Sequence, residues 1–196
     1  MKADCPESCV LAELVFEKPL SGDFPEVLFG SALGNTLWVR FSDALQIDPW
    51  IGKFDCGNFG GNKVTKIAEP DKFFVCAGGW FYFVNATARK LIEDPCRNEH
   101  VHDAVFDPTS RGVLTADWSS ISLIKSGVIE WSVRIPTDGI RNLKLEGNML
   151  RGLGEFDYDR TEREFTLDLE TKKYNVGARL VSDSSQEIAR PWWKFW

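Results

Sequence analysis

The chain has 196 residues, of which 43% are hydrophobic, which is enough to bury a continuous core as a single domain over residues 1–196. Its formal net charge of -6 argues against nucleic acid as a partner, because phosphate backbones are bound by surfaces rich in Lys and Arg. The first residues lack the apolar core of a signal peptide, and no run approaches the roughly 18 apolar residues of a membrane span, so we expect a cytoplasmic protein without a membrane partner.

Short runs rich in apolar and β-branched residues follow one another along the chain and are separated by turn residues. They fall into four groups of four, in repeats at about 10–54, 63–93, 101–133 and 140–176. The first group comprises 10–16, 27–31, 36–41 and 50–54, and the second comprises 63–68, 73–77, 80–84 and 90–93. The third comprises 101–106, 113–117, 120–124 and 128–133, and the fourth comprises 140–145, 149–153, 164–168 and 172–176. This pattern predicts an all-β protein with few helices.

The group at 101–133 shows the repeat most clearly. Its first two runs flank Asp107-Pro108-Thr109-Ser110-Arg111-Gly112, a turn made of residues that fix or release φ, and Ser126-Gly127 turns the chain before the last run. Aligned by their second runs, the groups are 46, 40 and 36 residues apart, starting from Val27, Phe73, Val113 and Met149. Repeats of about 40 residues are typical of propeller blades.

This order of strands and turns resembles a β-propeller of the WD or quinoprotein type, in which each blade is a four-stranded antiparallel sheet. The resemblance covers about residues 10–177 and rests on strand order and turn placement, because no Gly-His or Trp-Asp signature recurs at a fixed place. It implies a small propeller-like fold of antiparallel repeats. A meander that closes as a β-sandwich or barrel is the alternative. Four blades are few, so we expect incomplete closure unless the chain ends cover an open edge.

The cysteines indicate no metal centre and no disulfide framework. They are odd in number and contain no Cys-x-x-Cys pair. We expect reduced and mostly buried thiols, although Cys5 and Cys9 could bridge after export. The five positions are Cys5, Cys9, Cys56, Cys76 and Cys96.

Catalytic and cofactor motifs are missing from the sequence, which has no nucleophile elbow, phosphate-binding loop, dinucleotide fingerprint or His-Glu-x-x-His helix. His100 and His102 lie two apart on an expected strand and would share a face, but Ala104 stands where a hydrolase-like motif needs an acid. No other histidine completes a site. We therefore expect neither enzyme activity nor a cofactor.

An acidic segment connects the middle runs of the fourth repeat. Read as a calcium loop it fails, since Arg160 stands at the glycine position and Thr166 at the position of the bidentate Glu. It is either a solvated hairpin or an acidic arm presented to a basic partner. Its acids are Glu155, Asp157, Asp159, Glu162 and Glu164.

Tryptophan is the other informative residue, with 8 in the chain. Trp38, Trp80, Trp118 and Trp131 lie in or beside the expected strands, and packing between blades is their ordinary role. The tail at 178–196 ends in a cluster that includes Trp193 and Trp196, which is too apolar to stay in water. We predict that this tail docks onto its own domain and that truncation after Arg190 lowers the melting midpoint by several degrees; the same tryptophans are candidate partner-binding residues.

Together these features predict a non-enzymatic protein-binding module whose acidic surface meets a basic partner protein. By analogy, such small acidic chains without motifs are similar to bacterial immunity proteins, which neutralise a cognate toxin. The alternative is a propeller that binds a glycan or small molecule, or an enzyme derived from one, in which a strand tryptophan stacks on a sugar ring. Tryptophans lining a pocket with convergent polar groups would favour this alternative.

Overall fold

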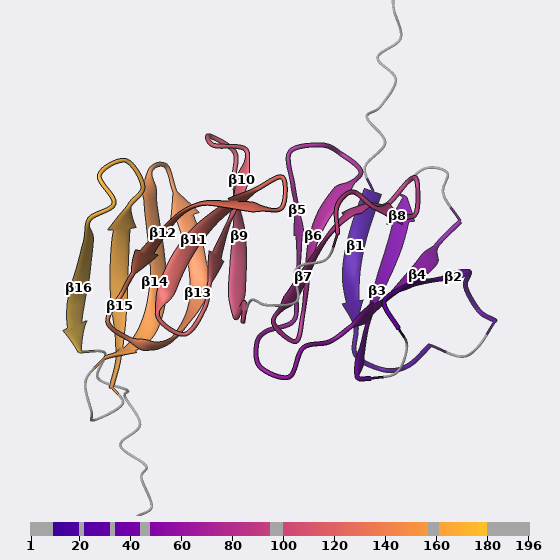
Figure 1. The fold of residues 1–196 in the computed structure, drawn as a ribbon, viewed down its shortest axis with the longest axis horizontal. Helices are drawn as coiled ribbons and strands as arrows, with labels where there is room; N and C mark the ends of the chain where they lie inside the picture. The colour runs from indigo at the N-terminus through magenta and orange to yellow at the C-terminus, as the bar shows by residue number, and fades with distance from the viewer. Residues whose placement is uncertain are drawn as a thin grey trace, which may run out of the picture.

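The computed structural model describes residues 10–19, 22–31, 34–43, 48–94, 100–156 and 161–179. Sixteen strands over these residues form four sheets of four strands, and this part of the chain contains no helix (Figure 1). The predicted all-β, propeller-like fold of repeats is therefore confirmed. Among the described residues, none forms a helix that could span a lipid bilayer.

Each sheet comes from one of the four predicted repeats. The first contains β1 (Val10–Val15), β2 (Glu26–Phe29), β3 (Thr36–Asp43) and β4 (Trp50–Asp55). The second contains β5 (Lys63–Lys66), β6 (Lys72–Ala77), β7 (Trp80–Asn85) and β8 (Lys90–Leu91). The third contains β9 (Asp103–Asp107), β10 (Gly112–Ala116), β11 (Ser120–Lys125) and β12 (Val128–Arg134). The fourth contains β13 (Asp138–Glu146), β14 (Met149–Phe156), β15 (Thr161–Asp168) and β16 (Tyr174–Arg179).

The last three sheets are antiparallel meanders, but the first is not. Its order is β1-β3-β4-β2, with β2 at the far edge and parallel to β4. The assignment of the run at Val27 as the second strand was therefore wrong, because the second strand in space is β3. The true second strands are 36, 40 and 37 residues apart, beginning at Thr36, Lys72, Gly112 and Met149.

Tight turns set the register inside the meanders. Gly78 and Gly79 join β6 to β7 with φ of 55° and 95°, and Ser126 and Gly127 join β11 to β12 with φ of 46° and 69°. Two-residue turns of type I′ need positive φ at both central residues, and their twist matches that of the paired strands. These turns therefore place each strand directly against its predecessor.

Side chains fill three separate cores, each between successive sheets. The first junction, between the first and second sheets, is rich in aromatic rings, among them Phe41, Trp50 and Phe54. The middle junction lies between the second and third sheets. The third junction, between the third and fourth sheets, is mainly aliphatic, with Leu114 and Ile140 at its centre. The sheets are thus stacked face to face, as propeller blades are.

The row of sheets does not close on itself within the described residues. The inner strands β1, β5, β9 and β13 are neighbours in that order. The first and last sheets lie at opposite ends of the longest axis of the molecule (Figure 1). The described residues therefore form an open row of four blade-like sheets.

Candidate functional site: the groove at Trp118

Trp118 lies in the turn between β10 and β11, and this turn holds it at the surface. The carboxylate of Asp117 accepts hydrogen bonds from the backbone N–H of Ser119 at 2.7 Å and of Ser120 at 2.6 Å. The backbone N–H of Gly139 donates to the carbonyl of Trp118 at 2.7 Å. Gly139 has a φ of 83°, and a Cβ on it would lie 4.0 Å from the Trp118 ring. Trp118 is therefore fixed against β13, yet 50% of it stays exposed.

His102 lies beside Trp118 just before β9. The two ring centroids are 4.4 Å apart, with the planes at 69°. Burial lowers the pKa of His102 and outweighs the opposing charge of Asp117, while the charge of His100 adds a smaller lowering effect. Nε2 of His102 is buried and has no hydrogen-bond partner among the residues that the structure describes. The imidazole is thus neutral near pH 7 and keeps one unused polar atom beside the indole.

The two histidines that share a face in the sequence pattern contact different rings. The His100 ring lies 6.0 Å from that of Phe59, whereas His102 packs on Trp118. Over the described ranges, no group of three or more His, Cys, Asp or Glu side chains is placed to hold a metal ion.

Three carboxylates form a row across the fourth sheet, next to Trp118. Asp138 on β13 pairs with Glu155 on β14, which pairs with Glu162 on β15. Directly paired residues project from the same face of a sheet, and like charges in such positions destabilise it. Arg141 offsets part of this charge through ion pairs with Glu155, at 3.5 Å, and with Glu162. Asp138 is exposed and has no ion-pair partner in the described part of the chain.

Trp118 and two members of this row, Asp138 and Glu155, border a groove made of two adjoining cavities. The cavity at Trp118 has a volume of about 700 Å³ and includes Asp138 and Glu155, so we call it the acidic end. The other cavity has a volume of about 730 Å³, and we call it the basic end. Both share His102 and Arg141, so they form one groove. The charged residues that line the basic end are Lys63, Asp103, Arg141, Lys144, Arg151 and Glu164.

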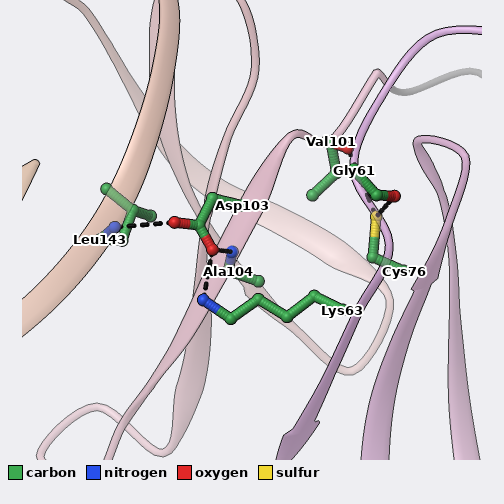
Figure 2. Close-up of polar contacts among 7 residues, drawn as sticks. All are labelled: Gly61, Lys63, Cys76, Val101, Asp103, Ala104 and Leu143. Carbon is green, nitrogen blue, oxygen red and sulfur yellow. Dashed lines mark hydrogen bonds and ion pairs between the residues drawn. The ribbon is translucent and has the colours of Figure 1, made fainter. Parts of the chain in front are cut away.

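Asp103 ties three sheets together at the floor of the groove (Figure 2). One carboxylate oxygen accepts from the backbone N–H of Leu143 on β13 at 2.7 Å. The other accepts from the N–H of Ala104 at 2.7 Å and pairs with the ammonium of Lys63 on β5. Because these contacts use both oxygens of a buried carboxylate, Asp103 has a structural role.

Close backbone packing beside Asp103 encloses the thiol of Cys76 (Figure 2). The thiol lies 3.2 Å from the carbonyl oxygen of Gly61 and 3.3 Å from that of Val101, both of which can accept its proton. A Cβ on Gly61 would come within 2.1 Å of the carbonyl oxygen of His102. Burial raises the pKa of Cys76 to about 12, so this thiol is structural rather than reactive.

The structure divides the predicted acidic segment. Glu155 lines the acidic end of the groove, and Glu164 lines the basic end, 3.7 Å from Arg151. Glu162 lines neither cavity but pairs with Arg141, which lines both. All three belong to β14 or β15 rather than to a connecting arm, because these strands continue to Phe156 and begin at Thr161. The remaining predicted site residues lie outside the described residues: Asp157, Asp159, Trp193 and Trp196.

Trp118 was one of four strand tryptophans that the alternative hypothesis considered for ligand stacking, and the sequence did not single it out. The strand tryptophans were expected to pack between sheets, but half of Trp118 is exposed. The signal was local, since Asp117 followed by Ser119 and Ser120 favours an Asx turn that carries the residue after Asp at its tip. Gly139, which the Trp118 ring covers, is distant in sequence, so no local pattern indicated that these two residues are in contact.

Comparison with known proteins shows the fold alone. No protein-family model matches the chain, and no curated protein matches it. Hydrazine synthase of Kuenenia stuttgartiensis is similar in structure, with a TM-score of 0.56 and 14% identity, over 83% of this chain and 52% of that chain. The WD40 domain of Neurospora crassa Pan2 is similar with a TM-score of 0.52 and 7% identity, over 74% of this chain and 48% of that chain. The chain thus spans about half the length of these structures.

Proposed function

We propose that this protein is a non-enzymatic binding module that holds a segment of a basic partner protein in the groove, with Trp118 as the anchor. The observation that carries the proposal is the state of Trp118, which is fixed by its carbonyl contact with Gly139 and by the His102 ring while half of it remains exposed. Residues that dominate binding energy are enriched in Trp and Arg. A rigid aromatic side chain beside Arg141 fits that composition and loses little conformational freedom on binding.

The partner is expected to be basic because both the whole chain and the surface beside Trp118 carry an excess of negative charge. The whole chain has a formal net charge of -6, which favours approach by a cationic protein. Locally, the row formed by Asp138, Glu155 and Glu162 carries three carboxylates against the single guanidinium of Arg141. An open groove with two cavities suits an extended segment better than an enclosed small molecule.

Neutralisation of a basic toxin is one form that this function would take. A partner segment seated at Trp118 would be covered on one side by the third and fourth sheets, and a catalytic surface next to it would be blocked. The support for this form is the acidic charge of the chain and the analogy with immunity proteins. Location in the cytoplasm belongs to the same proposal.

A glycan is the second candidate ligand, and one observation favours it. The exposed Trp118 ring stands beside polar groups that converge on one cavity, namely His102, Asp138, Arg141 and Glu155. An aromatic platform beside planar polar side chains is also how sugar rings are held. The excess of carboxylates at this end ranks a cationic protein segment above a neutral sugar.

A peptide library displayed on phage tests the proposal. Panning against the wild-type protein, with counter-selection against Trp118→Ala, should enrich basic peptides that bind only when the indole is present. Phe16→Ala is the matched control, because Phe16 is 89% exposed outside the groove, and this variant should bind as the wild type does. Failure to enrich any peptide that depends on Trp118 would contradict the proposal. Binding of the wild type but not Trp118→Ala to a glycan array would support the second candidate instead.

A further inference from the structure

The acidic end of the groove has more negative charge than its own residues neutralise. Asp138, Glu155 and Glu162 are in register across three neighbouring strands, so their repulsion is built into the sheet. Arg141 pairs with Glu155 and Glu162 and, among the described residues, forms no ion pair with Asp138. Asp117 adds a fourth carboxylate close enough to influence the pKa of His102. One further cation at Asp138 would relieve this repulsion.

Trp118 offers a second attraction for the same cation. A guanidinium or ammonium group within about 6 Å of an aromatic ring centroid is attracted by the ring, and Trp is the strongest partner. The protein makes such contacts elsewhere: Lys172 lies 3.8 Å from the ring centroid of Trp131, and Arg89 lies 5.8 Å from that of Trp50. Among the described residues, no Lys or Arg is found over Trp118.

The geometry points to a cation site: we propose that an Arg or Lys side chain of the partner lies over the Trp118 ring and pairs with the carboxylates of Asp138 and Glu155. This inference rests on the proposed function, because it names the chemistry of the partner at the same groove. His102 contributes through its neutral state, since a charged imidazole against the indole would compete with the incoming cation. An arginine fits better than a lysine, because its planar group can stack on the indole and bind a carboxylate with two hydrogen bonds.

Two small probes separate charge from shape. N-acetyl-arginine amide carries the guanidinium, whereas N-acetyl-citrulline amide has nearly the same shape with a neutral urea. The indole N–H signal of Trp118 in an NMR spectrum, assigned by its loss in Trp118→Phe, reports binding together with the amide signal of Gly139. The arginine probe should shift both signals to saturation at millimolar concentration, and the citrulline probe should leave them in place.

Variants then test whether Asp138 is a carboxylate that pairs with the bound cation. Asp138→Asn should weaken binding of the arginine probe by about fivefold. Glu146→Gln, at the far end of β13, neutralises an acid of the same sheet outside the acidic end and should leave binding unchanged. Equal shifts with both probes, or equal affinity in Asp138→Asn and the wild type, would overturn the cation site.

The outcomes for this site and for the proposed function are distinguishable. If panned peptides depend on Trp118 but lack Arg and Lys, the groove binds a protein segment and the cation site is wrong. If the arginine probe binds while no peptide depends on Trp118, the cation site holds and the protein-binding function fails.

Discussion

The first and third junctions between sheets differ in the side chains that form their cores and in the polar groups that lie beside those cores. In the first, aromatic rings pack on one another among aliphatic side chains, with Phe41 stacked on Trp50 at 4.4 Å and Phe54 on Phe29 at 4.9 Å. In the third, aliphatic side chains form the core, and polar groups gather at the end where β9 meets β13. Aromatic packing dominates the first junction, whose polar groups are internally satisfied, whereas the third combines packing with exposed charge.

The polar groups of the two junctions differ in how completely they are satisfied. In the first, the hydroxyl of Tyr82 donates to the carbonyl of Asp55 at 2.7 Å, and the Asp55 carboxylate accepts from the backbone N–H of Ser31 at 2.6 Å. In the third, Asp103 is satisfied, but Nε2 of His102 and the carboxylate of Asp138 have no hydrogen-bond or ion-pair partner among the described residues. Unused polar groups beside an exposed indole are what distinguish a binding groove from a core.

The largest expected effect comes from removing an aromatic ring in the first junction. Phe54 is fully buried between Phe29 and Tyr82, so Phe54→Ala should lower the free energy of unfolding by about 4 kcal/mol in urea denaturation. Phe59→Ala makes the same chemical change at a side chain that is 61% exposed, and it should cost less than about 0.5 kcal/mol. A small effect of Phe54→Ala would show that packing does not specify this junction.

Loss of the Asp103 contacts at the third junction should have the next largest effect on the free energy of unfolding. Asp103→Asn leaves one acceptor oxygen for the N–H groups of Ala104 and Leu143 and removes the charge that faces Lys63. We expect a loss of about 2 kcal/mol in the free energy of unfolding, measured by denaturation. Glu26→Gln breaks a more exposed ion pair on the first sheet and should cost less than about 1 kcal/mol. A loss larger than that of Phe54→Ala would reverse the comparison.

Sequence pattern predicted the strands well because each run encodes its own tendency to form a strand. The turn at Ser126-Gly127 also encodes its pairing, since its dihedral angles fix which strands meet. The pairing of β2 was not predictable in this way, because parallel strands share no turn. Phe29 seats β2 beside β4, through contacts with Trp50 and Phe54 that appear only when the chain has folded.

The candidate site was predictable in part. The acids of β14 and β15 stood out by number, and the structure places Glu155 in the lining of the groove and Glu162 in an ion pair with Arg141, while their binding role stays a prediction. Their relation to Trp118 was hidden, because it depends on the third sheet stacking on the fourth. Charge clusters are visible in a sequence, but the aromatic side chain that completes a site from another sheet is not.

Arg141 carries the electrostatic part of the difference between the two junctions. Arg141→Gln leaves Glu155 and Glu162 opposed without a cation, which should lower stability by about 0.5–1 kcal/mol at low salt, a modest value since these side chains are partly exposed. Denaturation at high salt should remove the difference, because screening weakens the repulsion. Lys125→Gln loses a single ion pair with Glu130 and serves as the control, with a smaller change. A loss in Arg141→Gln that is the same at all salt concentrations would indicate packing rather than charge.

The smallest expected effect is the pH dependence that His102 contributes. Burial beside Trp118 lowers its pKa from the ordinary value of 6.5, in spite of the opposing charge of Asp117. Below that value the unfolded chain binds a proton that the folded protein resists, so the free energy of unfolding falls as pH drops from 6.5 toward the lower folded pKa. His102→Gln should flatten this part of the stability profile, and NMR titration of the wild-type ring should show a midpoint below 6.5. A midpoint above that value would mean that Asp117 outweighs burial, and His102 would then be a cation in the groove and a competitor for the site at Trp118.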